Sequence, residues 1–191
     1  MDAGTIALIA ASSCWSLFEG WLILRDRARG KGTTTEDGGT RRFNILSVTL
    51  SPIVAAVMTA VPGVRDLGVR SGVMLGAGIG LMMIGLGLRA WAVAALGKYF
   101  RTTIELDKGQ KVIQSGPYRL IRHPSYTGLI LTCIGLGIAL QNIVSFAIVA
   151  ALPTVALLHR IEAEEKALAA GLGAAYASYQ ERTKKLIPGI W

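Results

Sequence analysis

The chain has 191 residues, of which 52% are hydrophobic and 17% are charged, and its mean hydropathy is +0.48. Such a composition is typical of an integral membrane protein and provides enough length for one domain. The formal net charge is +8, but the 20 lysines and arginines are grouped between apolar runs. This grouping indicates basic cytoplasmic loops and argues against nucleic-acid binding.

The two cysteines, Cys14 and Cys133, lie within apolar runs, and neither has a neighbour at the spacing of metal ligands. We therefore expect no disulfide framework and no metal site. The first apolar run is preceded by Asp2 and by no lysine or arginine, so it lacks the basic start of a secretory signal. We expect it to be retained as a membrane span.

Three apolar runs in the first half of the chain are each long enough to cross a hydrocarbon core of about 30 Å. They comprise residues 3–24, 44–64 and 73–96. Residues 25–43 predict a basic surface loop and residues 65–71 a short turn. Glu19 is expected at the membrane interface close to Arg25, rather than as a proton relay. Pro52 is expected to kink the second span.

The third run contains glycines at every fourth position, Gly72, Gly76 and Gly80, a ladder that would let another helix approach closely. A nucleotide-binding reading of these glycines is disfavoured because no strand precedes them. Arg89 and Trp91 near the end of the run are expected as a snorkelling residue and an interfacial belt residue.

Residues 97–124 form a polar segment that we expect to fold against the helical bundle. Pro117 and Pro124 prevent the intervening backbone from being one undisturbed helix. Two apolar runs follow, residues 125–140 and 143–158, and the polar residues between them predict a helical hairpin, with Pro153 as a kink. An amphipathic helix is expected from His159 onward.

The segments between apolar runs that are rich in lysine and arginine should lie on the cytoplasmic side. They all lie on that side only if five segments cross the membrane, with the N-terminus outside and the C-terminus in the cytoplasm. The predicted fold is therefore an all-α integral membrane protein of an inner or plasma membrane, with five transmembrane helices. Residues 1–96 would supply three spans. Residues 97–191 would form the catalytic region, with a cytoplasmic cofactor-binding segment, the hairpin and the C-terminal helix.

The polar groups expected to meet on the cytoplasmic face are Tyr118, Arg122, His123, Tyr126, Arg160, Glu164 and Glu165. Plainer interpretations exist for several of them. Arg160 and Glu164 are four residues apart and could form a helix-surface ion pair. His123 could be a capping or interfacial residue, and Arg122 could pair with a lipid phosphate.

The spacing of these residues resembles that of the isoprenylcysteine carboxyl methyltransferase family over roughly residues 96 to 191. The matching pieces are Gly116-Pro117-Tyr118, Arg122-His123-Pro124-Ser125-Tyr126-Thr127-Gly128, Arg160-x-x-x-Glu164-Glu165-x-x-Leu168, Gly173-x-x-Tyr176-x-x-Tyr179 and Leu186-x-Pro188. The resemblance implies an integral membrane enzyme that uses S-adenosyl-L-methionine and takes a lipophilic or lipidated acceptor from the bilayer. One departure is Gln110, which stands where the family often has a histidine.

By the same resemblance, Arg160 would bind the substrate and, with Glu164, form the catalytic pair. Whether Glu164 or Glu165 faces the site is left open. The cofactor site would be lined by Gln110, Lys111, Val112, Ile113, Tyr118, Arg122, His123, Pro124, Tyr126 and Glu164. Aromatic rings and a carboxylate suit the sulfonium of such a cofactor, while a donor suits its carboxylate.

Two other functions remain open at this stage. Sterol reductases resemble this family in their C-terminal half, so an NADPH-dependent membrane reductase is one alternative. A non-enzymatic protein that binds lipid or a partner is the other. The acceptor could be a carboxylate, which needs no general base, or a thiol or amine, which would need one. The oligomeric state is not predicted.

Overall fold

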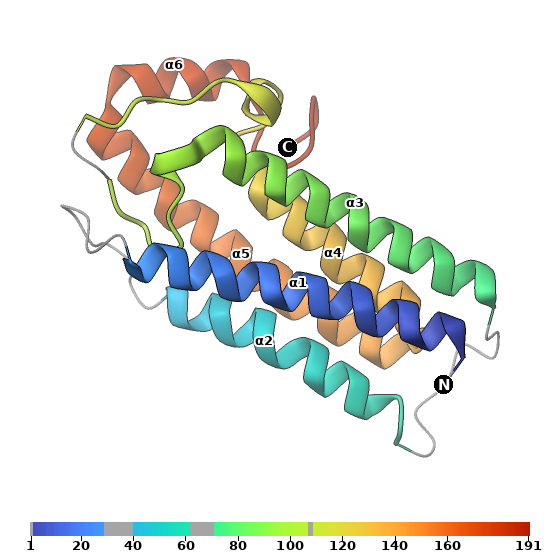
Figure 1. The fold of residues 1–191 in the computed structure, drawn as a ribbon. Coiled ribbons are helices and arrows are strands. Elements are labelled where there is room, and N and C mark those ends of the chain that lie inside the picture. Colours follow the sequence, from blue (N-terminus) through green and yellow to red (C-terminus); the bar gives the residue numbers. More distant parts are fainter. Residues whose placement is uncertain (1, 29–39, 62–70, 107–108) are drawn as a thin grey trace.

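In a computed structural model, which describes residues 2–28, 40–61, 71–106 and 109–191, the described chain is all-helical, as predicted. Its elements are α1 (Ala3–Ala28), α2 (Thr40–Met58), α3 (Gly72–Leu96), the 3-10 turns η1 (Gly97–Tyr99) and η2 (Gly116–Arg119), α4 (Pro124–Leu140), α5 (Ile143–Leu172) and α6 (Ala174–Arg182). The first five α-helices run along one bundle and alternate in direction (Figure 1).

Three helical segments among the described residues are long and apolar enough to cross a membrane, Ala3–Ala28, Gly72–Tyr99 and Ile143–Leu172. Shorter apolar helices span Arg42–Met58 and Pro124–Leu140. Because lipid offers no hydrogen bonds to the backbone, runs of this kind satisfy their own N–H and C=O groups as helices. The chain is thus an integral membrane protein.

Several element boundaries differ from those predicted. Helix α2 ends at Met58, six residues early, and α5 continues without interruption through Pro153 to Leu172. The apolar run and the amphipathic helix expected after His159 are therefore a single helix. Residues 25–28 and 40–43, predicted as parts of a loop, are helical and belong to α1 and α2. The rest of that loop and residues 65–70 of the predicted turn lie outside the described residues.

The glycine ladder at Gly72, Gly76 and Gly80 is not the packing face, so that prediction is wrong: a Cβ on any of the three would meet nothing within 4 Å. The close approach is made by glycines seven residues apart on the antiparallel helices α3 and α4, namely Gly78 and Gly85 on the first and Gly128 and Gly135 on the second. A Cβ on Gly85 would lie 2.5 Å from the carbonyl oxygen of Gly128. Only glycine permits this backbone contact.

Glu19 and Arg89 pair with each other, which corrects the prediction that Arg89 snorkels. Arg89 Nε and Nη2 donate to the two carboxylate oxygens of Glu19 at 2.5 and 2.8 Å. Arg89 is 6% exposed and does not snorkel, whereas Trp91 is 55% exposed, in keeping with a belt position. Arg25, which was expected close to Glu19, donates to the carbonyl of Gly97 at 2.6 Å.

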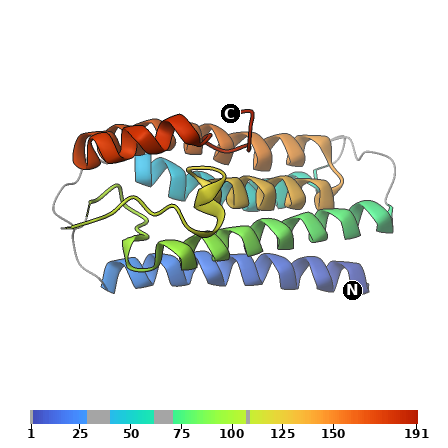
Figure 2. The same ribbon diagram turned by 90° about the horizontal axis from the view of Figure 1, so that it is seen from above.

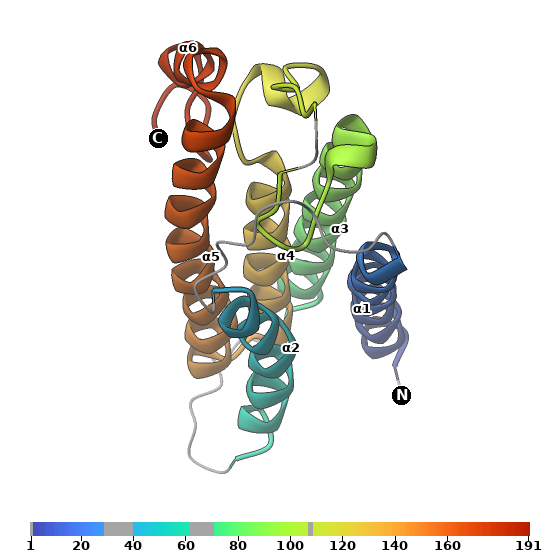
Figure 3. The same cartoon turned by 90° about the vertical axis from the view of Figure 1, so that its left-hand side faces the viewer.

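The polar segment, α6 and the C-terminal tail gather at one end of the bundle, where α1, α3 and α5 end and α2 and α4 begin (Figures 1 and 2). The tail is tied to the turn before α4, since the backbone N–H groups of Arg122 and His123 donate to the carbonyls of Lys184 and Lys185 at 2.8 and 3.0 Å. Seen from this side, α1 stands beside α3 and away from α5 (Figure 3). This end of the bundle holds the site.

Candidate functional site

A cavity that is open to solvent lies at the polar end of the bundle. All five tyrosines of the chain line it: Tyr99, Tyr118, Tyr126, Tyr176 and Tyr179. Every α-helix contributes to the lining, as do η2 and the segment between α3 and α4.

The cavity brings together nearly all of the residues predicted for the site. Pro124 is the exception, since it is fully buried at the start of α4 and is absent from the lining. Glu165 also lies outside the lining, so Glu164 is the carboxylate of this pair that faces the cavity. The predicted residues that line it are Gln110, Lys111, Val112, Ile113, Tyr118, Arg122, His123, Tyr126, Arg160 and Glu164.

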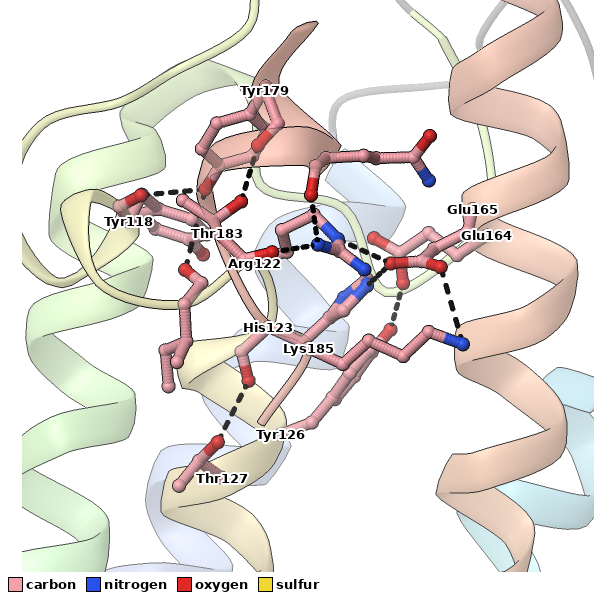
Figure 4. A network of polar contacts seen from close by, with 12 residues as sticks. Tyr118, Arg122, His123, Tyr126, Thr127, Glu164, Glu165, Tyr179, Thr183 and Lys185 are labelled. Carbon is pink, nitrogen blue, oxygen red and sulfur yellow. Dashed lines mark hydrogen bonds and ion pairs between the residues drawn. The ribbon is translucent and has the colours of Figure 1, made fainter. Parts of the chain in front are cut away.

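Glu165, outside the cavity lining, stabilises the turn before α4. Its Oε1 accepts from Arg122 Nε at 2.7 Å and lies 3.2 Å from His123 Nε2, and its Oε2 lies 3.5 Å from Lys185 Nζ (Figure 4). Arg122 also donates to the carbonyl of Thr183. Arg122 is therefore engaged within the protein rather than with lipid, and His123 makes no side-chain cap on α4.

Tyr126 links the two predicted catalytic residues. Its hydroxyl donates to Glu164 Oε2 at 2.5 Å and accepts from Arg160 Nε at 2.9 Å. Arg160 is only 3% exposed, so its interpretation as half of a surface ion pair is wrong. The His123 and Tyr126 rings stack with centroids 5.5 Å apart. Ring, carboxylate and guanidinium thus hold one another in fixed orientations.

The segment after η1 completes the wall beside Arg160. Arg160 Nη2 donates to the carbonyl of Thr102 at 2.6 Å. The backbone N–H of Thr102 donates to Asp26 Oδ2 of α1 at 3.1 Å, and its hydroxyl donates to the same oxygen. The first and fifth helices are therefore connected through this short segment.

Three of the cavity's tyrosines, Tyr118, Tyr176 and Tyr179, lie outside the membrane-spanning helices, and burial favours the neutral form of each. It raises the pKa of Tyr179 to about 12, and it raises the pKa of Tyr118 and of Tyr176 well above the ordinary value, with Glu164 adding to both shifts. The Tyr179 hydroxyl donates to the carbonyl of Tyr118 at 2.7 Å. The hydroxyl of Tyr176, by contrast, has no hydrogen-bond partner in the described part of the chain.

The first half of the chain contributes more to the cavity than its sequence suggested. Glu19 and Arg89 line it. Each is the sole charged residue within its apolar run, and a charged residue in such a run is a sequence signal for a functional position. Apolar side chains located one or two turns into the helices form its inner wall: Ile23, Ile45, Val48 and Leu129. The cavity thus has a polar, aromatic part near α6 and an apolar part within the bundle.

Comparison with known proteins relates the region from α3 to α5 to one family. Residues 78–170 match the model of the isoprenylcysteine carboxyl methyltransferase family, a stretch that includes most of α3, all of α4 and most of α5. This region, slightly less than half of the chain, is similar to that family. The matched region carries the predicted site residues from Gln110 to Glu164, but it ends before α6 and the cavity's tyrosines on that helix.

Individual relatives agree with the family match. The chain is 31% identical over 115 residues to protein-S-isoprenylcysteine O-methyltransferase B of Arabidopsis thaliana, covering 58% of each protein. It is 28% identical over 114 residues to the protein-S-isoprenylcysteine O-methyltransferase of Schizosaccharomyces pombe, covering 59% of this chain and 48% of the relative. An uncharacterized Bacillus subtilis protein, YpbQ, is 35% identical over 81 residues, 42% of this chain and 48% of the relative. The chain thus spans about half the length of these relatives.

Proposed function

We propose that this protein is a membrane methyltransferase that uses S-adenosyl-L-methionine and acts on a lipophilic acceptor, of which an isoprenylcysteine-type carboxylate fits best. The observation that carries the proposal is the Arg160–Tyr126–Glu164 connection. It stands inside one cavity with an aromatic polar part and an apolar inner part. Two similar proteins have names that describe O-methylation of protein isoprenylcysteine.

The polar part suits the methyl donor chemically. When bound, S-adenosyl-L-methionine supplies a methyl group on a positively charged sulfur. Tyr118 and Tyr126 offer aromatic faces to such a cation, and the Glu164 carboxylate offers a negative charge nearby. The segment from Gln110 to Ile113 would provide backbone contacts. Such contacts survive with glutamine in place of histidine, whereas a contact specific to histidine would be lost.

Arg160 would hold the acceptor. Its planar guanidinium is oriented by Tyr126 and Thr102, and a carboxylate is the group that such a fork binds best. The inner wall, with Ile23, Val48 and Leu129, would receive the attached lipid chain. A carboxylate is ionised at neutral pH and needs no general base. The residues would then contribute by positioning the reactants and excluding water.

The arrangement in the membrane follows from the same proposal. We infer that α1 to α5 all cross, that α4 and α5 form a transmembrane hairpin, and that the polar end with the C-terminus faces the cytoplasm. The distribution of lysine and arginine favours this orientation. Reporter fusions at the two chain ends test it, since the opposite labelling pattern would contradict it.

Binding of the two rival cofactors to one detergent-purified sample tests the function. We expect calorimetry to detect S-adenosyl-L-methionine and not NADPH, and the reverse result would favour a reductase. Transfer of a radiolabelled methyl group to a farnesylcysteine analogue, but not to its methyl ester, would then identify the carboxylate as acceptor. No binding of S-adenosyl-L-methionine would overturn the proposal. Turnover that is measured in the wild type and lost in both Arg160→Ala and Glu164→Ala would exclude a non-enzymatic role.

A further inference from the structure

Tyr176 differs from the tyrosines around it. It is 3% exposed and lines the cavity, yet its hydroxyl has no hydrogen-bond partner among the described residues. The hydroxyls of Tyr126 and Tyr179 are both satisfied within the protein. Buried hydroxyl groups are nearly always paired, so an unpaired one beside a cavity indicates a partner that binds there.

The surroundings of Tyr176 indicate what kind of group that partner presents. Glu164 and Arg122, which line the cavity, and Glu165, which lies outside the lining, all act electrostatically on its hydroxyl. Its ring lies 6.0 Å from that of Tyr179 on the same short helix. Burial raises the pKa of Tyr176 and keeps the phenol protonated, able both to donate and to accept. A hydrocarbon chain could not satisfy such a group.

We propose that the Tyr176 hydroxyl is a binding group for the amino-acid end of the methyl donor. This inference rests on the proposed function and adds to it a residue of α6, beyond the region matched by the family model. An ammonium would be attracted by the Glu164 carboxylate and could donate to the phenol oxygen. A carboxylate could instead accept from the phenol. Either contact satisfies the hydroxyl and fixes the cofactor's orientation.

The variant Tyr176→Phe removes only the hydroxyl and tests the proposal by binding and by stability, without any turnover measurement. We expect its affinity for S-adenosyl-L-methionine and for S-adenosylhomocysteine to fall about tenfold, because a hydrogen bond to a charged group is lost. Affinity for 5′-methylthioadenosine, which has the same nucleoside without the amino-acid end, should not change. The melting temperature of the ligand-free variant should be unchanged or higher, since no internal bond is removed.

Tyr179→Phe is the matched control, because its hydroxyl donates to the carbonyl of Tyr118 at 2.7 Å. This variant should lower the melting temperature of the ligand-free protein, in contrast to Tyr176→Phe. Unchanged affinity for S-adenosyl-L-methionine in Tyr176→Phe would overturn the inference, as would an equal loss for 5′-methylthioadenosine. If the wild type itself bound neither S-adenosyl-L-methionine nor S-adenosylhomocysteine, the proposed function would fail instead.

Discussion

Arg89 of α3 donates through Nε and Nη2 to both carboxylate oxygens of Glu19 in α1, at 2.5 and 2.8 Å. Its Nη1 donates to the Ser125 hydroxyl at 2.9 Å, so one guanidinium connects three helices. Two-point pairing of this kind is strong in a low-dielectric interior, provided that both partners are present.

Removing one member of this pair should therefore cost more than removing both. We expect Arg89→Met or Glu19→Leu to lower the free energy of unfolding by about 3 kcal/mol, since each leaves an uncompensated charge. The double variant should be less destabilised than the sum of the single variants. Thermal unfolding in detergent measures this, and strictly additive losses would show that the two side chains are not coupled.

The α3–α4 contact predicts opposite effects for two glycines. A Cβ on Gly128 would lie 2.6 Å from the carbonyl of Gly85 and 2.7 Å from the backbone nitrogen of Arg89. Gly128→Ala should therefore destabilise the protein by about 1–3 kcal/mol. Gly80→Ala meets nothing within 4 Å and should stabilise α3 by up to about 1 kcal/mol. Equal melting temperatures for the two variants would contradict the packing described.

Arg160→Lys should separate acceptor binding from cofactor binding. Lysine keeps the positive charge but cannot reproduce the planar fork that contacts Tyr126 and Thr102. We expect kcat/KM for the acceptor to fall by about 10- to 100-fold, while the affinity for S-adenosyl-L-methionine stays within a few-fold. Lys166→Ala, at an exposed position on the same helix, serves as control and should behave as the wild type. A matching loss of cofactor affinity in Arg160→Lys would place Arg160 in the cofactor site instead.

The buried tyrosines predict alkaline unfolding. An unfolded tyrosine has a pKa of about 10, whereas burial raises the pKa of Tyr179 to about 12 and that of Tyr118 above its ordinary value. Their contribution to stability is thus complete below about pH 10 and is lost as pH rises through the folded-state values. Absorbance at 295 nm should show these tyrosines ionising late and together with loss of helix. Ionisation of all five near pH 10 in folded protein would refute this.

Much of the fold could be predicted from the sequence because the bilayer leaves few choices for an apolar backbone. Runs of about 20 apolar residues must be helical to satisfy their own peptide groups, and α1 and α3 begin within one residue of the predicted spans. Pro117 and Pro124 indicated that the backbone before α4 is not a continuous helix. The motif resemblance indicated Tyr118, His123, Tyr126, Arg160 and Glu164, and all five line one cavity.

By contrast, the tertiary structure alone determined which neighbour each face of a helix contacts. Adjacent positions such as Glu164 and Glu165 differ by about 100° around the helix axis, so one lines the cavity and the other holds Arg122. The choice depends on how α5 is rotated by its neighbours. The glycine contact between α3 and α4 and the pairing of Glu19 with Arg89 likewise depend on which helices pack together. Periodicity within one run defines the faces of a helix, but the partner of each face follows from the packing of the whole bundle.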